Sequence, residues 1–210
     1  RRAAGKSELG KVSLRAYHRG NHIYIEVEDD GGGIEYERVK QSAVERGLDL
    51  AVLERNVAAM AARARALGVG LRPHAKTHKC VEVGRLQRDA GAQGITVATI
   101  VEAEAFAAAG FDDITWAIPL PLSRLPEVIA LARRVTLRVL VDSQAAGEAL
   151  DQAARGAGIR VHVLLEVDCG YHRSGVDPTR AQSVELARRL ASAAGLVFDG
   201  ILTHAGHSYH

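Results

Sequence analysis

The strongest constraint on the fold is a regular alternation, from about residue 50 onward, of short apolar segments with longer segments rich in alanine, leucine, glutamate and arginine. The short segments are β-branched and apolar almost throughout, as strands of a parallel sheet covered by helices must be. The longer segments have the length and composition of the covering helices. The pattern therefore predicts an α/β fold with about six β/α units.

The expected strands span residues 71–76, 94–99, 113–119, 138–142, 161–168 and 198–204, and the expected helices span residues 50–67, 101–109, 125–134, 145–157 and 180–194. Most strands end in a polar residue, namely Lys76, Thr99, Asp142, Asp168 and His204. In a (β/α)8 barrel the carboxyl edge of the strands carries the active site. An open doubly wound sheet would give the same alternation, and periodicity alone does not decide between the two.

Composition excludes several classes of protein. The chain has 210 residues, is 47% hydrophobic and carries a formal net charge of +2, so no bulk positive charge favours nucleic acid as a partner. No apolar run approaches the roughly 18 residues of a membrane span, and the N-terminus lacks the apolar core of a signal peptide. We therefore expect a cytoplasmic protein. Cys80 and Cys169 are far apart and form no C-x-x-C pair, which favours buried reduced thiols.

The first 48 residues have a different pattern. Residues 11–17 and 22–28 alternate apolar and polar side chains around the turn Arg19-Gly20-Asn21, which predicts a β-hairpin. Residues 35–46 indicate a short charged helix. We therefore expect a short α+β fragment to precede the regular α/β part.

Residues 71–79, Leu-Arg-Pro-His-Ala-Lys-Thr-His-Lys, set two lysines among two histidines at the end of a predicted strand. A lysine in a partly desolvated setting near other cationic groups can act as a nucleophile and form a Schiff base. Lys76 is the candidate, with His74, His78 and Lys79 close in sequence. The alternative is a pair of solvated loop lysines beside incidental histidines.

Further blocks follow in order: residues 91–104, the D-x-G-x-x-R-x-G-V segment at 168–176, and Thr-His-Ala-Gly-His-Ser-Tyr at 203–209. With the helix that begins near residue 49, these blocks make residues 49–210 resemble the D-threonine aldolase and D-serine dehydratase family of fold type III pyridoxal-phosphate enzymes. That family shares the N-terminal barrel of alanine racemase. The resemblance implies a partial (β/α)8 TIM-type barrel and a pyridoxal-phosphate-dependent lyase that acts on small D-amino acids.

The resemblance also implies roles for individual residues. Lys76 would hold pyridoxal 5'-phosphate and transfer protons. Arg173 would donate to the phenolic oxygen of the cofactor. His204 would lie against the pyridine ring, and Tyr209 would reach the cofactor or its phosphate. A surface or capping role for Arg173 and a hydrogen-bonded strand-end role for His204 are the structural alternatives.

The resemblance implies a homodimer in full-length relatives and a divalent metal bound there by a later domain. We expect no metal site in this chain. The spacing of His204, His207 and His210 would gather ligands only on a helix, and Gly206 with Ser208 predicts a loop. About two of the eight barrel units are missing from the pattern, so the barrel would be C-terminally truncated. We therefore predict little or no turnover.

Residues 1–6, 12–18 and 25–34 resemble the middle of the ATP-binding domain of chemotaxis histidine kinases. The resemblance implies that Asp29 would bind the adenine amino group, while Gly31 and Gly33 would allow close backbone approach. The flanking motifs of that domain are absent, so no complete nucleotide pocket is expected. Our hypothesis is that the chain joins two unrelated fragments near residue 48, by gene fusion, frameshift or sequence assembly.

Several functions therefore stay open. The first is a D-amino-acid lyase, either an aldolase or a dehydratase. Others are a non-catalytic barrel that binds the cofactor, and an amino-acid racemase relative, which would need a second base opposite Lys76 that the sequence does not identify. The last is a signalling module derived from the kinase-like segment.

Overall fold

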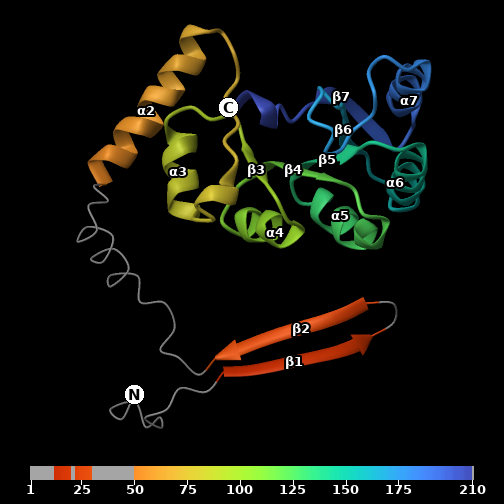
Figure 1. Cartoon of the computed structure of the whole chain (residues 1–210), viewed down its shortest axis with the longest axis horizontal. Coiled ribbons are helices and arrows are strands. Elements are labelled where there is room, and N and C mark those ends of the chain that lie inside the picture. Colours follow the sequence, from red (N-terminus) through yellow and green to blue (C-terminus); the bar gives the residue numbers. More distant parts are fainter. Residues whose placement is uncertain (1–11, 20–21, 30–49, 210) are drawn as a thin grey trace. The chain divides into compact units, whose positions relative to one another are not determined.

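The computed structural model describes residues 12–19, 22–29 and 50–209. The chain forms two compact units, Arg1–Leu53 and Glu54–His210. In the first unit, strand β1 (Val12–Arg19) pairs antiparallel with β2 (His22–Asp29), with Arg19 opposite His22 (Figure 1). The predicted hairpin is therefore confirmed. The predicted helix at 35–46 lies outside the described residues, and the proposed boundary near residue 48 stays a prediction.

The second unit is built on a parallel sheet of five strands. These are β3 (Ile95–Val97), β4 (Asp113–Pro119), β5 (Thr136–Val141), β6 (Val161–Glu166) and β7 (Leu196–Leu202). Their order in the sheet is their order in the chain. A doubly wound sheet reverses strand order at its switch point, and no reversal occurs among the described strands. The sheet therefore has the topology of a barrel segment, which decides the alternative that periodicity left open.

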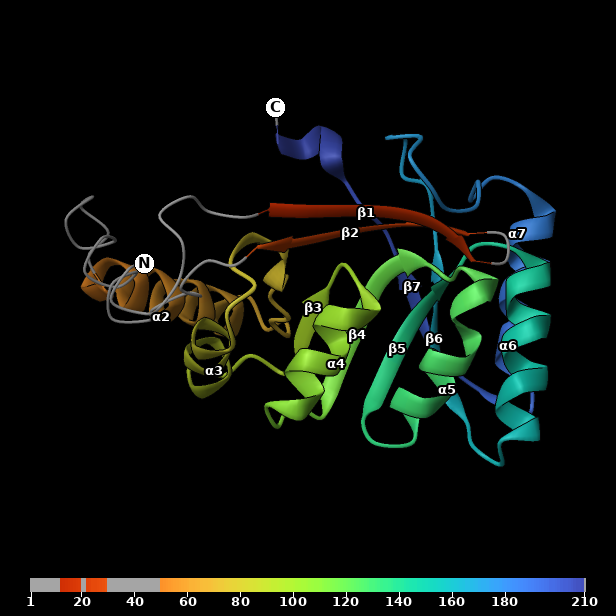
Figure 2. The ribbon, with the colours of Figure 1, turned by 90° about the horizontal axis from the view of Figure 1, so that it is seen from below.

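Two helices, α2 (Leu50–Ala66) and α3 (Val81–Asp89), precede β3. From β3 on, a helix follows each strand up to β6: α4 (Ile100–Ala108), α5 (Leu125–Ala132), α6 (Gln144–Gly156) and α7 (Ala181–Ser192), with a short 3₁₀ turn, η3 (Leu122–Arg124), before α5. Figure 2 shows α4, α5 and α6 side by side along one face of the sheet. Local sequence fixes where these helices begin. Thr99 and Glu102 form a reciprocal capping box on α4, and the Ser143 hydroxyl accepts from the Ala146 N–H at the start of α6.

The hydrophobic core lies between these helices and what we call the outer face of the sheet. Alternate strand residues point into it, and Leu137, Val139 and Val141 of β5 are at most 1% exposed. Val128 of α5 and Leu150 of α6 complete the contact from the helix side and are fully buried. At about 25 cal/mol per Å² of buried apolar surface, this layer is the main source of stability of the unit.

One expectation about secondary structure was wrong, and one helix was missed. Residues 71–76 form no regular strand, although the Thr96 N–H donates to the Pro73 carbonyl and His74 makes a single parallel bridge to Thr96. Pro73 has no N–H to continue the ladder, and the chain then turns into the 3₁₀ segment η2 (Ala75–Thr77). Helix α3 was not predicted, because its sequence is largely polar.

Cys80 and Cys169 are both free. Cys169 is exposed rather than buried, because it lies in the turn that follows β6. Among the described residues, no helix combines the length and the apolar character needed to cross a membrane. The cytoplasmic location and the homodimer stay predictions from the sequence.

Candidate active site

A cavity of about 620 Å³ opens at the carboxyl edge of the sheet, within the size range typical of small-molecule sites. It brings together three of the residues that the sequence singled out, Lys76, Arg173 and His204. These come from η2, from the loop after β6 and from the end of β7, so segments about 130 residues apart in the chain meet here. The other lining residues are Arg72, His74, Thr96, Ala98, Ala117, Ile118, Pro119, Glu166, Ser174, Leu202 and Thr203.

The 3₁₀ turn η2 presents Lys76 to the cavity. The ring of His74 caps this turn, because its Nδ1 accepts from the Lys76 N–H at 3.3 Å. That contact requires Nδ1 to be unprotonated. Burial lowers the pKa of His74, and the Lys76 charge lowers it further, so the cap is neutral near pH 7. Lys76 itself is exposed rather than partly desolvated, because η2 lies beyond the sheet edge.

Two other residues of the motif, Lys79 and His78, make contacts outside the cavity. The Lys79 ammonium pairs with Glu102 Oε1 at 3.0 Å, where Glu102 also caps α4. His78 Nδ1 accepts from the Cys80 N–H at 3.1 Å, and burial lowers the pKa of His78. Neither residue lines the cavity. Among the described residues no carboxylate pairs with the Lys76 ammonium, so the structure distinguishes Lys76 from Lys79.

The loop that joins β6 to Val176 carries Arg173. Its base is closed by the Asp168 N–H, which donates to the Val176 carbonyl, and by the Val176 N–H, which donates to the Glu166 carbonyl, both at 2.9 Å. Gly175 has φ +99°, and a Cβ there would lie 2.7 Å from the Asp168 nitrogen. Only glycine fits this closure without strain. The D-x-G-x-x-R-x-G-V segment is therefore a tight loop that presents its arginine to the cavity.

Glu166 is a cavity residue that sequence reasoning missed. It is the last residue of β6, and its side chain is 2% exposed. Its Oε1 accepts from the Ser174 hydroxyl at 2.7 Å, whereas its buried Oε2 has no hydrogen-bond partner among the described residues. The signal that could have identified Glu166 is an acidic residue closing an otherwise apolar strand.

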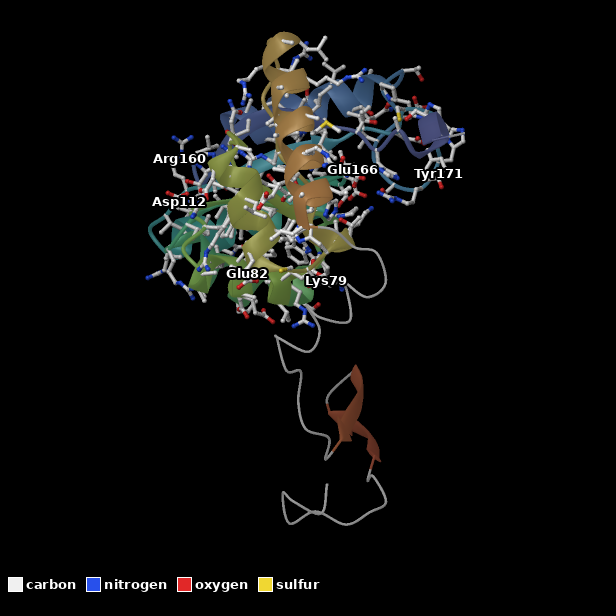
Figure 3. All side chains as sticks on the ribbon, turned by 90° about the vertical axis from the view of Figure 1, so that its left-hand side faces the viewer. Lys79, Glu82, Asp112, Arg160, Glu166 and Tyr171 are labelled. Atoms are coloured by element: carbon white, nitrogen blue, oxygen red, sulfur yellow. The ribbon has the colours of Figure 1, made fainter. Side chains whose placement is uncertain are left out.

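His204 follows β7 and meets an aromatic neighbour. The Tyr171 ring contacts it edge-on, with centroids 5.6 Å apart, and also lies 6.4 Å from the ring of His207. Figure 3 shows Tyr171 at the margin of the unit, with Glu166 further in. Burial lowers the pKa of His204, and the charges of Arg173 and Lys76 lower it further, while Glu166 opposes them. The net result is a neutral ring near pH 7.

The other predicted site residues are Tyr209, Asp29, Gly31 and Gly33, and none of them is among the described residues that line the cavity. The backbone of Tyr209 lies in the 3₁₀ turn η4 (Gly206–Tyr209), but its side chain is outside the described part of the chain. The loop that Gly206 and Ser208 predicted is instead a 3₁₀ turn, because both the N–H and the hydroxyl of Ser208 donate to the Ala205 carbonyl. Asp29 lies at the end of β2 with its side chain undescribed, and Gly31 and Gly33 are outside the described residues.

No group of three or more histidine, cysteine, aspartate or glutamate side chains suited to a metal occurs among the described residues. His210 is outside them, so the trio of His204, His207 and His210 is not tested.

A set of charged residues, which we call the inner ladder, lies on the inner face of the sheet and consists of Arg72, Asp113, Arg138, His162 and Asp199. Arg72 holds both carboxylate oxygens of Asp113, at 2.8 and 2.9 Å. Arg138 links Asp113 to Asp199, and His162 Nδ1 lies 3.0 Å from Asp199. Arg72 also lines the cavity, so the ladder adjoins the site.

The donor set fits pyridoxal phosphate. The cofactor needs an amine for its aldehyde, a cationic donor for its phenolic oxygen and a flat neighbour for its ring, and Lys76, Arg173 and His204 offer these around one cavity. The unpartnered buried Oε2 of Glu166 adds an acceptor in the same cavity.

A comparison with protein families agrees with this fit. Residues 48–210 match the family model described as alanine racemase, N-terminal domain. The chain belongs to this family. Its relatives include the D-threo-3-hydroxyaspartate dehydratase of Delftia sp. (strain HT23), which is 44% identical over 163 residues that cover 77% of this chain and 43% of the dehydratase. The chain thus spans less than half the length of this relative.

Solved structures share the fold of this chain. The structure of the Delftia dehydratase has a TM-score of 0.73 with 45% identity, and covers 77% of this chain and 43% of that one. The D-threonine aldolase of Filomicrobium marinum has a TM-score of 0.69 with 35% identity, and covers 73% of this chain and 42% of that one. These relatives confirm the predicted family and the predicted partial barrel.

A second, short similarity concerns a different class of protein. The chemotaxis protein CheA of Bacillus subtilis (strain 168) is 57% identical to this chain over 44 residues, which are 21% of this chain and 6% of CheA. The predicted resemblance to a chemotaxis kinase is therefore confirmed. The nucleotide-binding roles of Asp29, Gly31 and Gly33 stay predictions.

Proposed function

We propose that the barrel segment binds pyridoxal 5'-phosphate through Lys76 and belongs to a lyase that acts on D-amino acids carrying a 3-hydroxyl group. The observation that carries this proposal is the meeting of Lys76, Arg173 and His204 around one cavity at the carboxyl edge of the sheet. The names of the two relatives suggest the substrate class, since D-threo-3-hydroxyaspartate and D-threonine are both D-amino acids with a hydroxyl on the carbon next to the α-carbon.

Lys76, Arg173 and His204 have different roles in this proposal. Bound pyridoxal phosphate supplies an electron sink for negative charge on the substrate carbon that carries the amino group. Lys76 holds the cofactor by its amine and moves a proton at that substrate carbon. Arg173 donates a charge-assisted hydrogen bond to the phenolic oxygen. The lowered pKa of His204 keeps its ring neutral, so it lies against the cofactor ring without adding a positive charge.

Cofactor capture tests the first part of the proposal. The purified chain is titrated with pyridoxal phosphate, reduced with borohydride and digested, and the modified lysine is identified by mass spectrometry. Lys79→Ala is the matched control for Lys76→Ala, because Lys79 is three residues away and is held by Glu102 outside the cavity. We expect the parent and Lys79→Ala to trap cofactor at residue 76, and Lys76→Ala to trap none. Equal trapping by all three chains would contradict the proposal.

Substrate class is tested on the loaded chain. Addition of D-threonine or D-threo-3-hydroxyaspartate should change the cofactor absorbance, while the L-isomers should leave it unchanged. Release of glycine and acetaldehyde from D-threonine would identify an aldolase, and release of ammonia from the hydroxyaspartate would identify a dehydratase. A spectrum that responds equally to both enantiomers would instead favour the racemase alternative.

A further inference from the structure

The loop that presents Arg173 is held on both sides of that residue. On one side, Asp168 Oδ1 accepts from the N–H groups of Gly170 and His172 at 2.9 and 3.0 Å, and Asp168 Oδ2 lies 2.8 Å from His172 Nδ1. The two N–H bonds lower the pKa of Asp168 to about 2, so its carboxylate is ionised throughout the neutral range. His172, the residue before Arg173, is therefore held by the carboxylate of Asp168, which lies just after the end of β6.

Glu166 fixes the residue on the other side. The Ser174 hydroxyl donates to Glu166 Oε1 at 2.7 Å, and the Glu166 carbonyl accepts from the Val176 N–H at 2.9 Å. Arg173 thus sits between two anchored neighbours, His172 and Ser174. The position of the Arg173 backbone therefore depends on these two carboxylates.

Anchoring Ser174 uses only one oxygen of Glu166. Its Oε2 is buried, lines the same cavity as Arg173 and has no hydrogen-bond partner among the described residues. A buried carboxylate oxygen without a donor is costly, so a protein donor that turns toward it when the ligand binds would recover that cost. The cationic groups that line the cavity are Arg72, Lys76 and Arg173. Arg72 is engaged by Asp113 and Lys76 is assigned to the cofactor, which leaves Arg173.

We propose that Glu166 is a positioning residue for Arg173: its Oε2 accepts a hydrogen bond from the Arg173 guanidinium when pyridoxal phosphate is bound. The inference rests on the proposed function, because it assigns Arg173 to the cofactor. A guanidinium is planar and carries five N–H donors, so it can donate to the phenolic oxygen and to a carboxylate at once. Glu166 would then set the direction of the donor without touching the cofactor itself.

A double-mutant cycle tests the coupling. Cofactor affinity is measured by absorbance titration of the full chain for the parent, Glu166→Gln, Arg173→Ala and the double variant. We expect Glu166→Gln to bind pyridoxal phosphate about tenfold more weakly, equivalent to about 1.4 kcal/mol, and to be without effect in the Arg173→Ala background. The inference would be overturned if the two substitutions lowered cofactor affinity independently, so that their fold-losses multiplied in the double variant. It would also be overturned if Glu166→Gln bound the cofactor as tightly as the parent.

Ser174→Ala separates positioning from simple anchoring. It removes the contact with Oε1 and leaves Oε2 in place, so we expect a smaller loss of affinity than in Glu166→Gln. Equal losses would mean that Glu166 acts only through Ser174. If circular dichroism shows that Glu166→Gln does not fold, Glu166→Asp takes its place in the cycle with the same expected coupling.

Trapping at Lys76 distinguishes this inference from the function on which it rests. Failure of the parent to trap cofactor at Lys76 would sink both. If the parent traps cofactor at Lys76 but the losses of binding free energy in the cycle are additive, only the role assigned to Glu166 is wrong.

Discussion

The two faces of the same sheet differ in the charge that their side chains carry. On the outer face, Leu137, Val139 and Val141 of β5 are at most 1% exposed and pack against helices. On the inner face, the side chain of Arg138 from the same strand is 20% exposed and that of its partner Asp113 is 27% exposed. The outer face resembles the interior of any α/β protein, whereas the inner face carries paired charges and leads to the cavity. Stability and chemistry are thus divided between alternate residues of each strand.

The division follows from the pleat of the strand. Successive side chains point to opposite faces, so one strand can serve an apolar layer and a polar layer at once. In many (β/α)8 barrels branched aliphatic residues fill the interior. Here the inner ladder occupies part of that space, and its charges are compensated by direct pairing. Changes on the two faces should therefore have different costs and different dependence on pH.

The largest effect is expected on the outer face. Leu137→Ala should lower the free energy of unfolding by about 3 kcal/mol, because it removes buried methyl groups and leaves a cavity. Urea denaturation measures the change. Ile201→Ala on the edge strand β7 is the control, since Ile201 is 66% exposed and its truncation should cost less than about 0.5 kcal/mol. Similar costs at the two positions would mean that burial beneath the helices does not set the contribution of an apolar side chain on this face.

The next effect concerns the loop at the carboxyl edge. Gly175→Ala should cost about 2–3 kcal/mol in unfolding free energy, because its φ of +99° is unfavourable for alanine and the new Cβ would meet the backbone of residues 167 and 168. Gly110→Ala is matched in backbone conformation, with φ +89°, but its Cβ would enter open space. Its cost should be about 1 kcal/mol. Equal costs would mean that the loop closure is not tight.

Breaking the inner ladder should have a smaller effect. Asp113→Asn removes the charge that Arg72 and Arg138 share, and we expect a loss of about 2 kcal/mol in unfolding free energy because two guanidinium groups lose a charged acceptor. The neighbouring Asp112 is exposed, so Asp112→Asn should change stability by less than about 0.5 kcal/mol. An unchanged denaturation midpoint for Asp113→Asn would show that the ladder contributes nothing.

The smallest effect is a dependence on pH. Burial raises the pKa of Asp113, but hydrogen bonds and charges from Arg72 and Arg138 outweigh burial, so the net pKa is below its ordinary value of 3.8. A lowered folded-state pKa adds stability that is complete above the unfolded value and is lost as the pH falls through the folded value. The stability difference between the parent and Asp113→Asn should therefore be constant from pH 7 to about pH 5 and shrink below about pH 4. Urea midpoints between pH 3 and pH 7 measure it, and a difference that grows with acid would refute the sign.

The sequence predicted the regular strands and helices better than the segment that carries Lys76. Residues 113–119 were predicted as a strand and form β4, and the capping box of Thr99 and Glu102 begins α4 as local chemistry requires. Each of these depends on residues a few positions apart. Residues 71–76 failed as a strand because Pro73 and the His74 cap interrupt the ladder, a competition that apolar periodicity does not register.

For the site, the resemblance singled out Lys76, Arg173 and His204, and the tertiary structure brings them to one cavity. It missed Glu166, because the strand was expected to end at Asp168, whereas β6 ends at Glu166. It also did not distinguish Lys76 from Lys79 physically. That distinction depends on Glu102, which lies 23 residues beyond Lys79 and pairs with it across the start of α4.

By itself, the sequence determined the alternation of strands and helices, the hairpin near the N-terminus and the family of residues 48–210. Each of these features can be recognised from patterns of residues that are close together in the chain. Only the tertiary structure decided that the strands lie in chain order, that charges pair across the inner face and that Glu166 keeps one oxygen open to the cavity. The physical reason is the distance along the chain over which each kind of interaction acts. Periodicity and capping act over a few residues, whereas strand order and ion pairing depend on which distant segments the hydrophobic effect brings together.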